Sequence, residues 1–216
     1  MKSHKELKLR QRSERDTYPD SMGMRVHRAL SWLDRAERCE DDDGKIIFLW
    51  VAFNAAYAND VAEEYRESER TMFQNFLCAL QDNDTKGLLS SVVWTQFTGP
   101  IRVLLQNQYI FQPFWDSLNG KESGKDWQQR FADANSFVSR ALSRQETAEV
   151  LTVVMQRIYT LRNQLVHGGA TWDSNVNRDQ IRDCKHILEE VVPAILEIMM
   201  DNPRSFIGSH HYPVVD

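Results

Sequence analysis

The sequence contains little glycine, proline or cysteine, and each shortage narrows the class of fold. Among 216 residues there are nine glycines, six prolines and three cysteines. With apolar residues recurring every three or four positions, this composition gives little support to strands and predicts helices. Cys39, Cys78 and Cys184 are widely spaced, odd in number and without metal-ligand spacing. They are typical of buried thiols in a reducing compartment, so neither a disulfide framework nor a metal site is expected.

Long hydrophobic runs are also missing. The longest, residues 46–58, is interrupted by Asn54 and is shorter than the roughly 18 to 20 residues needed to cross a bilayer. The start of the chain has no apolar stretch of the kind that a secretory signal requires. We therefore expect a cytoplasmic protein with no membrane partner.

A strong positive charge is absent as well, because the formal net charge is -5. Non-specific coating of nucleic acid draws most of its free energy from Lys and Arg contacts with phosphate, so that class of protein is disfavoured. A local basic site is still compatible with the composition. We expect the basic residues 1–20 to form a flexible arm, and the alternative is a segment that contacts an acidic partner or a phosphate backbone.

The apolar periodicity predicts an all-α protein, a helical bundle with a core of four to five up-and-down helices and additional helices. We interpret residues 21–203 as one domain, since no repeat or linker divides them, and residues 204–216 as a C-terminal tail. Residues 85–140 exceed what a minimal four-helix core requires. We expect them to pack over one end of the bundle and to shape access of a substrate.

Two helix starts have recognisable sequence signals. Ser143 and Glu146 fit a capping box that opens a long helix. This helix is expected to run to about His167, where Gly168 and the glycine after it close it. Asn177 is the expected cap of the last helix.

The segment TLRNQLVHGG, residues 160–169, carries the most informative polar residues. Four residues fall on the side of a helical wheel opposite to the apolar face: Gln156, Tyr159, Asn163 and His167. Arg162 lies on the flank, about 140° from His167 on an ideal helix. Asn163 and His167 are four residues apart, so a hydrogen bond between them would orient the imidazole. The alternative is that His167 only helps to cap the helix while Arg162 pairs with a surface carboxylate.

This segment resembles the motif of the HEPN family, in which an Arg is followed after four to six residues by a His, usually with a polar residue directly after the Arg. Arg162, Asn163 and His167 match that pattern with four intervening residues. The earlier segment KIIFLWVAFNAAYA also looks like the central helix of bacterial HEPN proteins. The resemblance covers residues 24–200 and is strongest in residues 155–190.

The resemblance implies a HEPN-like bundle and a metal-independent endoribonuclease without a cofactor. Arg162 would then stabilise phosphate charge, His167 would act in acid-base catalysis and Asn163 would orient the imidazole. These residue types fit the reaction, because an imidazole with a pKa near 6.5 gives or takes a proton and a guanidinium grips two phosphate oxygens. The expected supporting or interface residues are Tyr159, Gln156 and Gly168.

RNA cleavage by the 2′-OH needs a base and an acid, yet one protomer supplies a single motif histidine. We therefore expect a homodimer whose two-fold axis brings the two motifs together. The expected partners are RNA, a second copy and, for a toxin or phage-defence effector, an antitoxin or regulatory protein. A toxin subgroup has a modified Tyr two positions after the His; here that position is Gly169, which argues against this regulation. The alternative function is a catalytically inactive HEPN module that binds a protein or nucleotide and dimerises.

Other candidate residues lack a supporting pattern. The acidic run 41–43 is not followed by a calcium-loop pattern, so a solvated turn between helices is expected. His186 has no identifiable partner and is expected at the surface. His210 and His211 have no Cys or carboxylate at ligand spacing and are expected in the tail.

Overall fold

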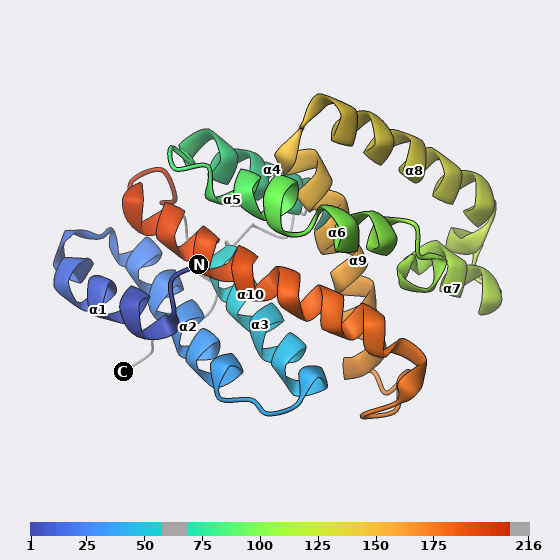
Figure 1. Cartoon of the computed structure of the whole chain (residues 1–216), viewed down its shortest axis with the longest axis horizontal. Helices are drawn as coiled ribbons and strands as arrows, with labels where there is room; N and C mark the ends of the chain where they lie inside the picture. Colours follow the sequence, from blue (N-terminus) through green and yellow to red (C-terminus); the bar gives the residue numbers. More distant parts are fainter. Residues whose placement is uncertain (58–68, 208–216) are drawn as a thin grey trace.

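Helices make up the fold in the part of the chain that the structure describes. The structure is a computed structural model that describes residues 1–57 and 69–207 (Figure 1). It contains no strand in these two ranges, and this confirms the predicted all-α class. The α-helices are α1 (His4–Glu14), α2 (Asp20–Glu37), α3 (Asp42–Tyr57), α4 (Glu69–Asn83), α5 (Leu88–Ser91), α6 (Thr98–Leu105), α7 (Gln112–Leu118), α8 (Trp127–Arg144), α9 (Thr147–Val166) and α10 (Arg178–Asp201). Short helical turns are η1 (Arg15–Thr17), η3 (Val92–Gln96), η4 (Gln108–Ile110), η5 (Glu122–Gly124) and η6 (Asn175–Asn177).

The last helix, α10, lies at the centre of the bundle. It contacts every helix from α1 to α6, and in Figure 1 it crosses the molecule between α2 and α3 on one side and α5 and α6 on the other. Residues 191–200 of this helix are all buried, because neighbours surround it on every side. The helix starts at the predicted place, with Asn177 at the cap position but without a side-chain capping hydrogen bond, and it continues through Pro193.

An aromatic cluster, consisting of Trp50, Phe53, Phe73 and Tyr159, connects α3, α4 and α9. The Trp50 side chain is 1% exposed, and its ring centroid lies 5.2 Å from that of Phe53, 5.9 Å from that of Phe73 and 5.8 Å from that of Tyr159. Aromatic pairs at such distances add to the stability that burial provides. The cluster therefore fixes α9 against the helices that precede it in the chain.

Residues 85–140 share the hydrophobic core of the rest of the bundle. Leu89, Val92, Ile101, Leu104 and Val138 are all buried in the same cluster as the residues of α2, α3 and α10. In Figure 1, α7 and α8 lie at one end of the molecule, and α8 packs against α7 and α9. The region thus packs against the bundle as expected, while its effect on substrate access stays a prediction.

The start of the chain differs from the flexible arm that was expected for residues 1–20. Residues 4–14 form α1, whose first turn is closed by a capping box between Ser3 and Glu6. Leu7 is fully buried where α1 packs against α2 and α10, and Arg10 pairs with Asp201 of α10 at 2.7 Å. The prediction was wrong because Lys5 and Arg12 are exposed on a helix whose other face supplies Leu7 to the core and Arg10 to an ion pair with α10.

Leu7 and Leu9 provide a matched test of this packing. We expect Leu7→Ala to lower the free energy of unfolding by about 2–4 kcal/mol, because it leaves a cavity in a buried site. Leu9 is 59% exposed, so Leu9→Ala is expected to change it by less than about 0.5 kcal/mol. Urea denaturation of the two variants measures the difference. Equal and small effects would mean that α1 does not dock in solution.

Part of the predicted C-terminal tail, residues 204–216, also belongs to the core. Phe206 is 5% exposed and meets the Phe76 ring edge-on at 6.3 Å, while its carbonyl accepts a hydrogen bond from Arg25 Nη1 at 3.0 Å. The sequence pattern of this segment does not reveal that its phenylalanine reaches the bundle. His210 and His211 lie outside the described residues.

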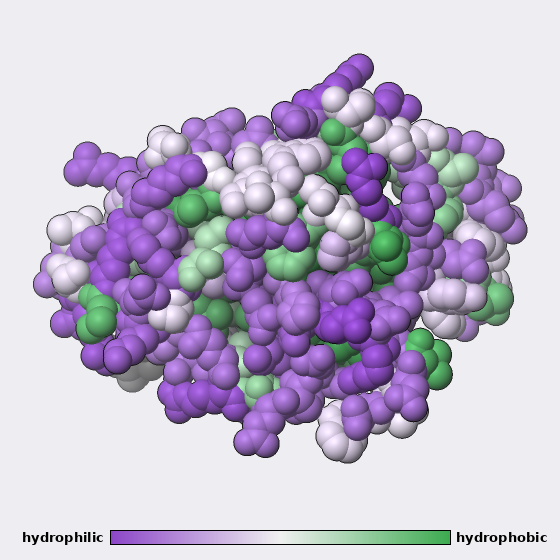
Figure 2. Space-filling view, in the orientation of Figure 1, coloured by the Kyte–Doolittle hydropathy of each residue, from purple (hydrophilic) through white to green (hydrophobic). Residues whose placement is uncertain are grey.

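The surface in the orientation of Figure 1 is mostly hydrophilic, and its hydrophobic residues form small separate groups (Figure 2). Such scattered apolar residues are normal on a folded domain and do not mark an extended apolar interface on this face. In the described ranges, no helix combines the length and the apolar character needed to cross a membrane.

Candidate functional site

Helix α9 carries the residues of the predicted motif and lies against α3, α4, α6 and α8. Its start differs from the predicted capping box. Ser143 belongs to α8, where its hydroxyl donates to the Arg140 carbonyl, and the side chain of Glu146 makes no capping hydrogen bond. Instead, the backbone N–H of Ala148 donates to Gln81 Oε1 of α4 at 2.7 Å. The cap therefore comes from another helix, which the local sequence pattern does not reveal.

The C-terminal end of α9 is formed as predicted, with glycine at the turn. His167 follows the last helical residue, and its N–H donates to the Asn163 carbonyl at 3.0 Å. Gly168 has a φ of +70°, a left-handed conformation that favours glycine, and the Gly169 N–H returns to the Gln164 carbonyl at 2.7 Å. These bonds satisfy the last carbonyls of the helix and direct the chain away just after the histidine.

Arg162 and Asn163 are joined by a side-chain hydrogen bond. Arg162 Nη1 donates to Asn163 Oδ1 at 2.9 Å, and both side chains are half-buried. The Asn163 amide oxygen was expected to orient the His167 imidazole, but the described part of the chain contains no hydrogen bond between these two side chains. The length of the arginine explains the difference, because it lets the guanidinium reach from the flank of the helix to the face of Asn163.

The His167 side chain lies on the surface. The residue is exposed, and its imidazole forms no hydrogen bond or ion pair with another described residue. Arg162 and Asn163 are half-buried near the end of α9 and hydrogen-bonded to each other, and His167 follows just after the last helical residue. Within the described ranges Arg162 has no carboxylate partner, which argues against the alternative of a surface ion pair.

Two of the expected supporting residues lie elsewhere. Tyr159 is half-buried in the aromatic cluster, and Gln156 lies one turn earlier in α9. Both line a cavity from which the three motif residues are absent. The helical wheel placed them with His167 because it assumes a single buried face, whereas α9 has neighbours on several sides. Gly168 does lie beside the motif, as expected.

The segment after the motif is tied to the start of α3. Trp172 Nε1 donates to Asp41 Oδ1 at 3.4 Å, and that oxygen also accepts from the Gly44 N–H at 2.7 Å. Asp43 is 4% exposed and accepts two hydrogen bonds from Arg178, at 2.5 and 2.7 Å. Residues 41–43 are thus not the solvated turn that was expected. Their carboxylates are used to cap α3 and to hold the start of α10.

Sequence reasoning missed Arg157, which is 3% exposed. A signal was present, because Arg157 is four residues from Val153 and four from Leu161, and both of these are buried. A charge in the middle of an apolar stripe indicates either a partner on another helix or a special site. Burial lowers the pKa of the Arg157 guanidinium to about 10.

The cysteines and carboxylates do not gather into a metal site in the described part of the chain. No group of three or more His, Cys, Asp or Glu side chains there has the arrangement to hold a metal ion. Cys39 and Cys184 are buried free thiols, and burial raises the pKa of Cys184 well above its usual range. This thiol is therefore protonated and unreactive at neutral pH.

Comparisons of the chain with protein-family models, with curated proteins and with solved structures found no match.

Proposed function

We propose that the protein is a metal-independent endoribonuclease of the HEPN type that acts as a homodimer. The observation that carries the proposal is the Arg162–Asn163 hydrogen bond, which draws the guanidinium from the flank of α9 toward Asn163, four residues before His167. On an ideal helix Arg162 would point away from that histidine. The resemblance of the segment RNQLVH to the HEPN motif supplies the reaction class.

In the proposed reaction the 2′-OH of RNA attacks the adjacent phosphorus, and the bond to the 5′-oxygen breaks. His167 of one copy takes the proton of the 2′-OH, and His167 of the second copy gives a proton to the departing 5′-oxygen. Arg162 binds the phosphate oxygens as negative charge develops on them. The products carry a 2′,3′-cyclic phosphate and a 5′-hydroxyl.

Exposed apolar residues around the motif support a two-fold interface there. Val166 is 46% exposed, Trp172 is 70% exposed and Val176 is 90% exposed, and all three lie in the helix end or the segment that follows it. Aromatic residues are enriched in the buried centre of protein interfaces. An interface that uses these side chains would bring the two copies of His167 near each other.

The experiment that tests the proposal is RNA cleavage by the purified full chain in the presence of EDTA. We expect fragments that end in a 2′,3′-cyclic phosphate, and we expect no cleavage when a 2′-deoxynucleotide replaces the nucleotide at the cut site. Sedimentation is expected to show a dimer. A monomer, or a panel of structured and single-stranded RNAs left intact, would contradict the proposal and favour a catalytically inactive binding module.

A further inference from the structure

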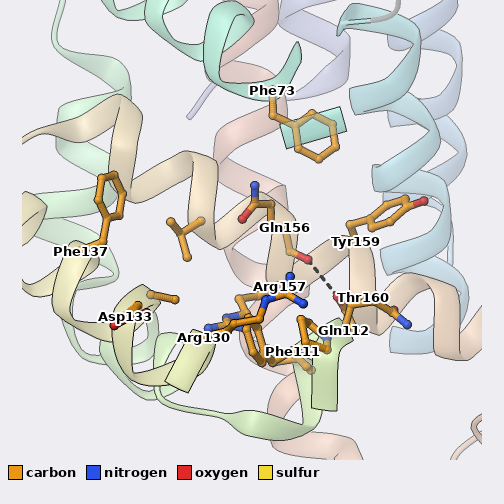
Figure 3. Close-up of a pocket in the computed structure, with 14 residues that line it drawn as sticks. Phe73, Phe111, Gln112, Arg130, Asp133, Phe137, Gln156, Arg157, Tyr159 and Thr160 are labelled. Carbon is orange, nitrogen blue, oxygen red and sulfur yellow. Dashed lines mark hydrogen bonds between the residues drawn. The ribbon is translucent and has the colours of Figure 1, made fainter. Parts of the chain in front are cut away.

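A cavity of about 570 Å³ lies between α9 and the helices of residues 108–137. Arg157, Gln156 and Tyr159 of α9 contribute to its wall, as do Arg130 of α8 and Phe73 of α4. In the view of Figure 3, the two arginines lie with Phe111 at one edge of the cavity, and Phe73 and Phe137 lie above them. The volume is in the range of sites that bind small molecules.

Arg157 is buried in this wall without a partner for its charge. Its Cζ lies 4.4 Å from the centroid of the Phe111 ring and 5.2 Å from that of Phe131, and its Nε has no hydrogen-bond partner. Ring faces offset part of the cost of removing the charge from water, but they do not accept hydrogen bonds in the plane of the guanidinium. The Nε donor of Arg157 therefore lacks an acceptor among the described residues.

The second buried arginine shows how this fold satisfies such a group elsewhere. Arg25 is also 3% exposed, and it donates to the Ala56 carbonyl at 2.9 Å and to the Phe206 carbonyl at 3.0 Å. Burial lowers the pKa of both guanidinium groups to about 10. Arg25 thus binds protein carbonyls, whereas no described residue accepts a hydrogen bond from Arg157.

The polar neighbours of Arg157 accept no hydrogen bond from it. Asp133 lines the same cavity, where its Oδ1 accepts from Gln129 at 2.9 Å, and it forms no ion pair with Arg157. Arg130 donates to the Ser123 carbonyl at 2.5 Å. Gln156 places an uncharged amide in the wall. The cavity wall thus contains two cationic side chains and one carboxylate, so its charge is net positive.

We propose that this cavity binds a small molecule with one carboxylate beside an aromatic or other apolar body. The planar guanidinium of Arg157 matches the two oxygens of a carboxylate, and Phe73, Phe137 and Val153 receive the apolar part. A phosphate dianion fits less well, because the Asp133 carboxylate in the same wall repels a double negative charge more strongly than the single charge of a carboxylate. The site is independent of the proposed cleavage reaction, since the motif residues do not line it.

Calorimetric titration of the full chain with 2-naphthoate tests the proposal, with 2-naphthamide and inorganic phosphate as comparison probes. We expect naphthoate to bind with a Kd below about 1 mM and at least about tenfold more tightly than either comparison probe. No binding of naphthoate, or tighter binding of the amide or of phosphate, would overturn the assignment.

Three variants test whether Arg157 is the residue that binds the carboxylate. Arg157→Met is expected to weaken naphthoate binding by at least about tenfold, and Arg157→Lys by a smaller factor, because it keeps a charge and loses the planar fork. We expect Arg157→Met to be at least as stable to heat as the wild type, since it replaces an unpartnered buried charge by an apolar chain. Arg140→Gln is the control, because Arg140 is an exposed arginine of α8 that does not line the cavity, and it is expected to change the Kd by less than about threefold. Unchanged binding in Arg157→Met, or an equal loss in Arg140→Gln, would contradict the role given to Arg157.

Discussion

Replacement of His167 by alanine is expected to lower the rate of RNA cleavage by about 10²–10⁴-fold, the usual contribution of a general acid or base. In a two-fold site each variant dimer loses both the base and the acid, so we expect the upper part of this range. RNA binding should change little, because Arg162 and Asn163 keep their positions through their own hydrogen bond.

The same substitution is expected to leave the fold intact. The His167 side chain is exposed, and the backbone N–H that closes the helix is present in alanine as well. A protonated histidine at a helix C-terminus contributes about 0.3–1 kcal/mol, so the free energy of unfolding should fall by no more than this. The loss of activity would then reflect chemistry and not unfolding.

His186→Ala is the control. His186 is half-buried on α10, so this substitution also removes an imidazole but leaves the motif residues unchanged. Initial rates on an end-labelled RNA, measured for both variants and the wild type, give the comparison. We expect His186→Ala to cleave at the wild-type rate. Equal rates for wild type and His167→Ala would remove His167 from the mechanism, and equal losses in both variants would point to a general structural effect.

Removal of the Trp50 ring is expected to have the largest effect on stability. Trp50 is 1% exposed and is in ring contact with Phe53, Phe73 and Tyr159. We expect Trp50→Ala to lower the free energy of unfolding by about 3–5 kcal/mol, because it removes buried apolar area and leaves a large cavity. The cavity would open between α3 and α9, so the motif helix would lose a principal support.

Trp32 provides the control for this substitution. Its side chain is 39% exposed and stacks on Phe48 with the ring centroids 5.9 Å apart. We expect Trp32→Ala to lower the free energy of unfolding by about 1 kcal/mol. Denaturant unfolding followed by circular dichroism measures both variants. A cost for Trp50→Ala as small as that for Trp32→Ala would mean that the aromatic cluster is not packed in solution.

Much of the fold could be predicted from the sequence, because helical periodicity is a local property. Asn177 indicated the start of α10, and Gly168 indicated the end of α9. What escaped prediction depends on contacts between distant segments. Leu7 is buried only because α2 and α10 lie beside it, and the cap of Ala148 comes from Gln81.

In the candidate site, too, local features were predictable and contacts between distant segments were not. The spacing of Asn163 and His167 predicted a hydrogen bond between their side chains, but the partner of the Asn163 oxygen is Arg162. Arg157 was not predicted as a site residue. Its two aromatic neighbours, Phe111 and Phe131, belong to earlier segments that contact α9 only in the folded chain. The ribonuclease activity and the dimer stay predictions.

The unpartnered charge of Arg157 has a consequence for the evolution of the protein. Natural proteins are rarely at their stability optimum, and stabilising substitutions carry a cost mainly where function uses the residue that they replace. With the binding role proposed for Arg157, an apolar replacement would stabilise the fold and would be opposed by selection while the ligand is used. Among descendants of this gene, lineages that no longer meet the ligand should replace position 157 first, and the variation at this one codon would record where the ligand is still encountered.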